Sequence, residues 1–103
     1  MKIRNGFVSN SSSSSFCINK DNLTPLQILL IKNHCKFVIE NWQGITDIIE
    51  KYELPRLYKP EITYAWNIEE NEEEISGNTY MDNFDMDAFL NLIGVKDVEF
   101  KEY

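Results

Sequence analysis

The 103-residue sequence has few of the residues on which enzymes, metal sites and disulfide frameworks depend. It contains one histidine, His34, and two cysteines, Cys17 and Cys35. Two cysteines do not make a disulfide framework, so we expect a reducing compartment. On a helix, adjacent side chains such as those of His34 and Cys35 point about 100° apart, which is a poor arrangement for a nucleophile–base pair. We therefore expect no catalytic residue and no cofactor, with His34 at the surface or its boundary and Cys35 buried.

Long apolar runs are also missing. The most apolar stretch, 26–31, is interrupted by Gln27 and is far shorter than the roughly 20 residues that span a bilayer. The basic start of the chain is followed by polar serines and not by an apolar core, so we do not expect a cleaved signal peptide. The sequence predicts no contact with a membrane.

Positive charge is scarce in the second part of the chain. Residues 1–60 carry eight Lys and Arg against five Asp and Glu, whereas residues 61–103 carry two Lys against twelve Asp and Glu. Such an acidic segment is not expected to bind nucleic acid phosphates directly. Two interpretations remain open, namely a solvated surface that aids solubility and an acidic face that binds a basic surface of a partner protein.

Serine is abundant in one place, a tract of five between two short apolar segments. Backbone N–H groups and hydroxyls of such a tract can hold a phosphate, which makes a weak candidate ligand-binding site of Ser11, Ser12, Ser13, Ser14 and Ser15. Phosphate loops, however, need glycines and a following helix, and here Gly6 is the only nearby glycine. A polar linker and a recognition or modification tag are the alternatives.

The first half of the chain predicts a short strand and two helices. Residues 16–18 are apolar and favour a strand. Thr24 is a suitable N-cap with Pro25 at the first helical position, and Leu26, Leu29 and Leu30 follow one helical face. The first helix is expected to reach about Asn41, although residues 36–41 also fit a strand, and Gly44 is expected to end it. A second helix is expected over 45–52, followed by a linker over 55–60.

The second half predicts an antiparallel hairpin. Apolar residues alternate with polar ones over 61–68 and again over 74–81, with a glutamate-rich turn between them. A simple register pairs Ile68 with Ile75 and Trp66 with Gly77, so that the indole covers the position where glycine lacks a side chain. The exposed hairpin face carries Thr63, Ala65, Asn67, Ser76, Asn78 and Tyr80.

A capped helix and a short strand complete the predicted fold. Asp85 is the expected N-cap, Phe84 and Phe89 occupy the positions of a hydrophobic staple, and Gly94 ends the helix. Capping also explains Asp82, Asp85 and Asp87, whose spacing does not fit a calcium loop. A strand is expected over 97–101. We predict one α+β domain, with an extended segment over 1–15, a globular core over 16–103, and a small antiparallel sheet with two or three helices packed on one face.

The glutamate-rich turn and the tyrosine beyond it form the candidate partner-binding set. Its members are exposed in the predicted hairpin and are of the kinds that contact a basic partner, namely Glu69, Glu70, Glu72, Glu73, Glu74 and Tyr80. An unpaired strand edge also leaves a homodimer open.

Two stretches of the sequence resemble a known family. The opening MKIRNGFVSNSSSSSF resembles the N-terminal signature of small proteins of tailed bacteriophages and prophages. The pattern ISGxTxMDNFDMxxFLxxIGV resembles the core of one such family. The matching residues are Trp66, Ile68, Glu69, Ile75, Gly77, Thr79, Met81, Asp82, Asn83, Phe84, Asp85, Met86, Phe89, Leu90, Ile93 and Gly94. Residues 35–60 are unmatched, and the resemblance carries no catalytic residue or cofactor.

The resemblance implies a phage context and hence the cytoplasm of an infected bacterial cell. Together with the acidity it predicts a small phage accessory protein that binds a host or phage protein, for example a nucleic-acid-handling or defence protein. A phosphate- or nucleotide-binding module and a minor virion-packaged protein are the alternatives.

Overall fold

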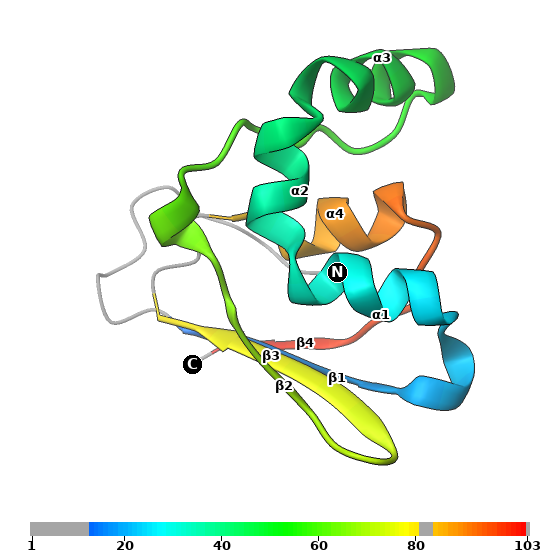
Figure 1. Cartoon of the computed structure of the whole chain (residues 1–103), viewed down its shortest axis with the longest axis vertical. Coiled ribbons are helices and arrows are strands. Elements are labelled where there is room, and N and C mark those ends of the chain that lie inside the picture. The colour runs from blue at the N-terminus through cyan, green and yellow to red at the C-terminus, as the bar shows by residue number, and fades with distance from the viewer. Residues whose placement is uncertain (1–12, 81–83, 103) are drawn as a thin grey trace.

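The computed structural model describes residues 13–80 and 84–102, and within these ranges the chain forms one sheet of four strands and four α-helices. The strand order is β2-β3-β1-β4, and every neighbouring pair is antiparallel. Figure 1 shows the helices on one face of the sheet, with α3 farthest from it. The predicted α+β class is confirmed. The strands are β1 (Ser14–Asn19), β2 (Asn67–Glu70), β3 (Glu74–Thr79) and β4 (Phe100–Glu102).

Three short helices, separated at two asparagines, replace the predicted pair. These helices are α1 (Pro25–Lys32), α2 (His34–Glu40) and α3 (Trp42–Tyr52), so residues 36–40 are helical and Gly44 lies inside α3 rather than ending a helix. At both breaks the asparagine Nδ2 donates to the carbonyl oxygen four residues earlier, at 3.0 Å for Asn33 and 2.9 Å for Asn41. Of the helices in the described ranges, none has the length and apolar composition needed to cross a membrane.

The start of α1 follows the prediction, but its apolar face does not. Thr24 Oγ1 accepts from the Gln27 N–H at 3.1 Å and Gln27 Oε1 accepts from the Thr24 N–H at 2.9 Å, which forms a capping box. Leu26 and Leu29, however, are 62% and 56% exposed. Ile31 is instead the fully buried residue of this helix.

The first hairpin strand is much shorter than the predicted 61–68. Residues 62–64 form a 3-10 helix, η2 (Ile62–Tyr64), and β2 begins only at Asn67. The Ala65 N–H, which a longer strand would direct toward β3, donates to the Ile62 carbonyl at 3.4 Å. The Trp66 N–H donates to His34 Nε2 on α2 at 2.9 Å. The Trp66 indole N–H donates to the Phe84 carbonyl at 3.0 Å. These two bonds hold the segment before β2 against α2 and the start of α4, so the alternating pattern did not produce a strand there.

The predicted register is also wrong, by two residues. Ile68 pairs with Gly77 and Glu70 pairs with Ile75, because the turn closes tightly at residues 71–74 and β2 continues to Glu70. Gly77 is covered by its neighbours on both sides and not by Trp66. A Cβ at Gly77 would lie 2.5 Å from Phe16 Cε2 and 2.9 Å from Ile68 Cδ1.

The last helix, α4 (Met86–Leu92), has the predicted caps. Asp85 Oδ1 accepts from the Ala88 N–H at 3.2 Å, and Gly94 ends the helix with a φ of 88°. The rings of Phe84 and Phe89 are in contact, with their centroids 5.6 Å apart, and both are buried. β4 starts at Phe100 rather than at residue 97, because Asp97 has a φ of 62° and belongs to the preceding turn.

Candidate partner-binding site

Asn71 organises the turn between β2 and β3. Its Oδ1 accepts from the backbone N–H of Glu73 at 2.8 Å and of Glu74 at 2.7 Å, while its own N–H donates to the Glu74 carbonyl at 2.9 Å. Asparagine favours such turns because its short side chain reaches backbone groups two and three residues ahead. The turn therefore places Glu72 and Glu73 at the tip of the hairpin and Glu74 at the start of β3.

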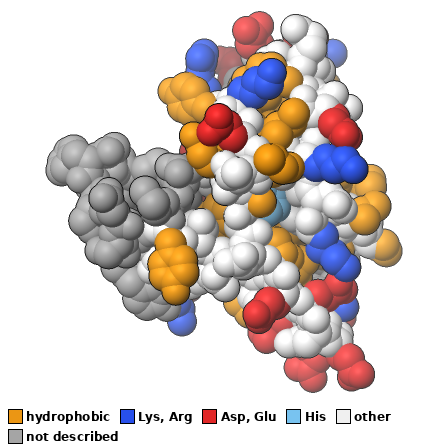
Figure 2. Space-filling model, turned by 60° about the vertical axis from the view of Figure 1, so that its left-hand side comes forward, with side chains coloured by type: hydrophobic (Ala, Val, Ile, Leu, Met, Phe, Trp, Pro, Cys, Tyr) orange, Lys and Arg blue, Asp and Glu red, His pale blue; other side chains and the backbone are white. Residues whose placement is uncertain are grey.

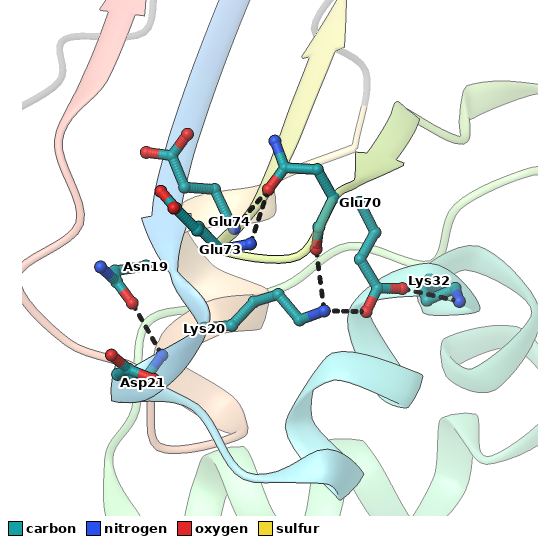
Figure 3. Close-up of polar contacts among 8 residues, drawn as sticks. Asn19, Lys20, Asp21, Lys32, Glu70, Glu73 and Glu74 are labelled. Carbon is teal, nitrogen blue, oxygen red and sulfur yellow. Dashed lines mark hydrogen bonds and ion pairs between the residues drawn. The ribbon is translucent and has the colours of Figure 1, made fainter.

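Glu70 is neutralised within the protein. Its Oε2 lies 2.7 Å from Lys20 Nζ and its Oε1 lies 2.9 Å from Lys32 Nζ, so the carboxylate sits between two lysines (Figure 3). Hydrogen bonds from Lys20 and then from Lys32 lower the pKa of this carboxyl group. Lys20 Nζ also donates to the Asn71 carbonyl at 2.9 Å. Glu70 thus holds the hairpin against α1 and the end of β1, and its charge is already compensated.

Among the described residues, the other four glutamates of the candidate set have no such compensation. No ion pair joins them to a lysine or arginine within 13–80 and 84–102. All four are exposed, namely Glu69, Glu72, Glu73 and Glu74. Acidic side chains gather at the lower end of the molecule in Figure 2, which is where Figure 1 places the β2–β3 turn. We call these four residues the acidic tip.

Tyr80 does not lie with the acidic tip. It follows the far end of β3, six positions after Glu74, which in an extended strand corresponds to roughly 20 Å. Its side chain is 73% exposed. The structure therefore divides the candidate set into an acidic tip at one end of the sheet and an exposed tyrosine at the other.

The serine tract is not a loop throughout. Ser14 and Ser15 belong to β1, Ser13 precedes it, and Ser11 and Ser12 lie outside the described residues. Ser14 is buried on the helix-covered face, and because side chains alternate along a strand, Ser15 points to the other face. These two hydroxyls consequently do not converge on one ligand.

His34 is buried, in contrast to the prediction of a surface or boundary position. It is 2% exposed, with Nδ1 donating to the Ile31 carbonyl at 2.7 Å and Nε2 accepting from the Trp66 N–H at 2.9 Å. This pattern requires the neutral Nδ1–H tautomer. Its ring packs edge-on against Phe84, with centroids 4.7 Å apart. Burial lowers the pKa of His34, an effect that the bond to Ile31 partly opposes. Both nitrogens are occupied, so His34 is a structural residue.

Cys35 is buried as predicted, and its chemistry is suppressed. The side chain is 2% exposed, and burial raises the pKa of the thiol to about 11. Sγ donates to the Glu61 carbonyl at 3.4 Å, away from the two groups that His34 contacts. A thiol with so high a pKa supplies almost no thiolate near neutral pH. Cys35 and His34 do not form a nucleophile–base pair.

Cys17 differs from Cys35 in exposure, which leads to a testable difference in reactivity. Cys17 lies on the exposed face of β1. The pKa of its thiol is raised, mainly by partial burial and secondly by the nearby side chain of Glu74. At about pH 8 we expect native protein to react with 5,5′-dithiobis(2-nitrobenzoate) at Cys17 alone, and at Cys35 only after unfolding. Cys17→Ser should abolish the native reaction. Equal rates for the two thiols would contradict the buried position of Cys35.

The face of the sheet opposite the helices is open and carries small polar side chains. Of the residues predicted there, Asn67, Ser76 and Asn78 lie on it, whereas Thr63 belongs to η2 and Ala65 precedes β2. A polar, uncovered face is usual for an antiparallel sheet.

Three residues of the site were not identified from the sequence, namely Lys20, Lys32 and Asn71. Asn71 stands before three glutamates and carries a local signal, since asparagine favours turns. The lysines carry none, because they lie 51 and 38 residues away from the groups to which they donate.

Within the residues that the structure describes, no three His, Cys, Asp or Glu side chains lie together in a way that could hold a metal ion. Comparisons with protein-family models, with curated proteins and with solved structures found no match to this chain.

Proposed function

We propose that this protein is a small acidic accessory protein of a bacteriophage that binds a host or phage protein in the cytoplasm of the infected bacterial cell. The observation that carries the proposal is the acidic tip, where four exposed carboxylates lie together without a cation partner among the described residues. Glu70, by contrast, is compensated by two lysines. Uncompensated charges that gather on one end of a protein favour association with a surface of opposite charge.

The sign of the charge indicates the kind of partner. A basic protein surface that normally holds nucleic acid complements an acidic tip, and occupying that surface inhibits the enzyme that carries it. The phage context rests on the resemblance of the N-terminal and hairpin–helix segments, and the inhibitory role rests on the charge.

Charge reversal at the tip tests the proposal. We expect Glu72→Lys, Glu73→Lys and Glu74→Lys, combined, to reduce recovery of the partner from infected cells by about tenfold or more, because attraction becomes repulsion. The captured protein is identified by mass spectrometry, purified, and titrated against the wild-type chain at low and high salt.

A matched variant controls for net charge. Glu40, Asp47 and Glu50 are exposed residues of α2 and α3, away from the hairpin, and reversing them changes the net charge by the same amount. This variant should retain the partner. Equal losses in the two variants, or no loss in either, would refute a role for the acidic tip. Comparable melting temperatures of all three proteins establish that the fold is intact.

A further inference from the structure

β2 forms one edge of the sheet, and its outer side is unpaired within the described chain. Opposed residues of an antiparallel pair alternate between those that exchange backbone hydrogen bonds and those that do not. The Asn71 N–H donates to the Glu74 carbonyl, so this pair is of the bonded kind. Counting back along the register, Glu69 and Asn67 bond to β3, whereas Ile68 and Glu70 do not.

Ile68 and Glu70 therefore turn their backbone N–H and C=O groups away from β3, toward the edge. Along β3, residues whose backbone groups face β1 alternate with residues whose groups face β2. The Lys20 N–H donates to the Glu73 carbonyl at 2.8 Å, so Glu73 faces the β1 side and Glu74 faces β2, in agreement with the bond between Asn71 and Glu74. No described residue donates to, or accepts from, these outward groups. An extended peptide can add to such an edge with a regular ladder.

The side chains of β2 define what an added strand should carry. On the helix-covered face, the half-buried Ile68 favours an apolar neighbour. The carboxylate of Glu70 is already bound by Lys20 and Lys32, so it needs no basic side chain from an added strand. On the open face, Asn67 and Glu69 are exposed, and Glu69 belongs to the acidic tip. Side chains of an added strand alternate between these two faces. The edge thus matches a strand in which apolar and basic residues alternate.

From this match we infer that β2 is a docking edge for an extended basic segment of a partner protein, which adds to the sheet as a fifth strand next to β2. Its backbone bonds to Ile68 and Glu70, and its basic side chains contact Glu69 and the rest of the acidic tip. The inference deepens the proposed function and rests on it, since it specifies how the acidic partner-binding end is used and what the partner presents.

A second copy of this chain is a poorer occupant of the same edge. Pairing β2 with its own copy would bring Glu69 and Glu70 of one chain beside the same residues of the other, and like charges across a strand pair are destabilising. Charged residues of this kind prevent edge-to-edge self-association in many sheets.

Amide hydrogen exchange measured by NMR tests the inference on the full chain. In the free protein, we expect the amides of Ile68 and Glu70 to exchange fast and those of Glu69 and Asn71 to exchange slowly. The probe is the peptide Lys-Val-Lys-Val-Lys-Val-Lys. Its binding should slow the exchange of Ile68 and Glu70 by about tenfold or more, because their N–H groups become hydrogen-bonded. Raising the salt from about 50 to about 500 mM should weaken binding.

Two control peptides separate a strand ladder from simple charge attraction. The first control peptide carries N-methyl groups on its three valines, the residues that would bond to Ile68 and Glu70 in an antiparallel ladder, so it keeps its charge but loses those donors. The second, the Glu-Val analogue, reverses the charge. Neither should slow exchange at Ile68 and Glu70. Absence of binding by the lysine peptide, or equal protection by the N-methylated form, overturns the inference. Shifts confined to the acidic tip overturn it too, but leave the proposed function standing. If the free protein is a dimer in which the amides of Ile68 and Glu70 exchange slowly, the edge of β2 pairs with a second copy of the chain. That result also overturns the inference.

Discussion

Replacing Gly77 with alanine is expected to lower the free energy of unfolding by about 1 to 3 kcal/mol. The new Cβ would lie 2.5 Å from Phe16 Cε2, closer than non-bonded carbons approach. Phe16 has little freedom to move, because its ring is buried and packs against Trp66 and Phe100 at centroid distances of 5.7 Å each. Chemical denaturation followed by tryptophan fluorescence measures the change.

The same substitution at Gly44 is the matched control. Gly44 lies inside α3, and apart from the backbone of its own helix no described atom lies within 4 Å of the place that a Cβ would take. Because alanine is a better helix former, Gly44→Ala should raise the free energy of unfolding by about 0.5 to 1 kcal/mol. The two variants are thus expected to change stability in opposite directions. An unchanged free energy of unfolding in Gly77→Ala would contradict the close approach of Phe16 on β1 and Ile68 on β2 to this position.

Acidification from neutral pH is expected to destabilise the protein through His34. Burial holds its pKa below the ordinary value of 6.5 in the folded state. Below that value the unfolded chain binds a proton on His34 that the folded chain does not, so the free energy of unfolding falls as pH falls. The loss begins as the pH falls toward 6.5 and ends when the pH reaches the folded pKa. Protonation would also place an N–H on Nε2 against the Trp66 N–H.

His34→Leu should separate the two contributions of this residue. The variant leaves the buried Trp66 N–H without its acceptor, which costs about 1 to 3 kcal/mol at neutral pH. Since His34 is the only histidine, the variant should also lose the decline between pH 7 and pH 5.5. Urea denaturation at several pH values gives both quantities. An unchanged pH dependence in the variant would mean that another group titrates in this range.

Local chemistry made the helix starts and the last helix end predictable. Thr24 and Asp85 bond to backbone N–H groups three residues ahead, and Gly94 adopts a positive φ, so the signals and the structure involve the same few residues. The first helix was expected to reach about Asn41, and α2 does end there. The break at Asn33 was missed, because asparagine at such a position is also compatible with a continuous helix.

The strand over 61–66 failed as a prediction for a non-local reason. Its alternation of apolar and polar residues is genuine, and Trp66 is buried as the pattern implies. The chain departs from the strand at η2, where the Ala65 N–H donates to the Ile62 carbonyl at 3.4 Å, and His34 Nε2, 32 residues away, holds the Trp66 N–H against α2. Of the residues on that predicted face, Trp66 is buried but Ile62 is 59% exposed, because the 3-10 turn of η2 ends the alternation of faces that a strand would give.

The candidate site was predictable in composition but not in its internal division. The glutamate run marks an exposed turn from sequence alone, and the structure places the turn there. Only the fold brings Lys20 and Lys32 to Glu70, which separates one structural carboxylate from the four of the acidic tip. Likewise, only the length of β3 separates Tyr80 from the tip.

The position of β1 restricts the order in which the protein assembles during synthesis. β1 is an inner strand whose two neighbours, β3 and β4, both come from the last third of the chain. A nascent chain that has emerged only as far as α3 therefore holds β1 and three helices but no strand with which β1 can pair. The apolar residues Phe16 and Ile18 must wait for Ile75 and Phe100. Until then these side chains lack the partners of the finished sheet, and exposed apolar surface of this kind makes unfinished chains prone to aggregation.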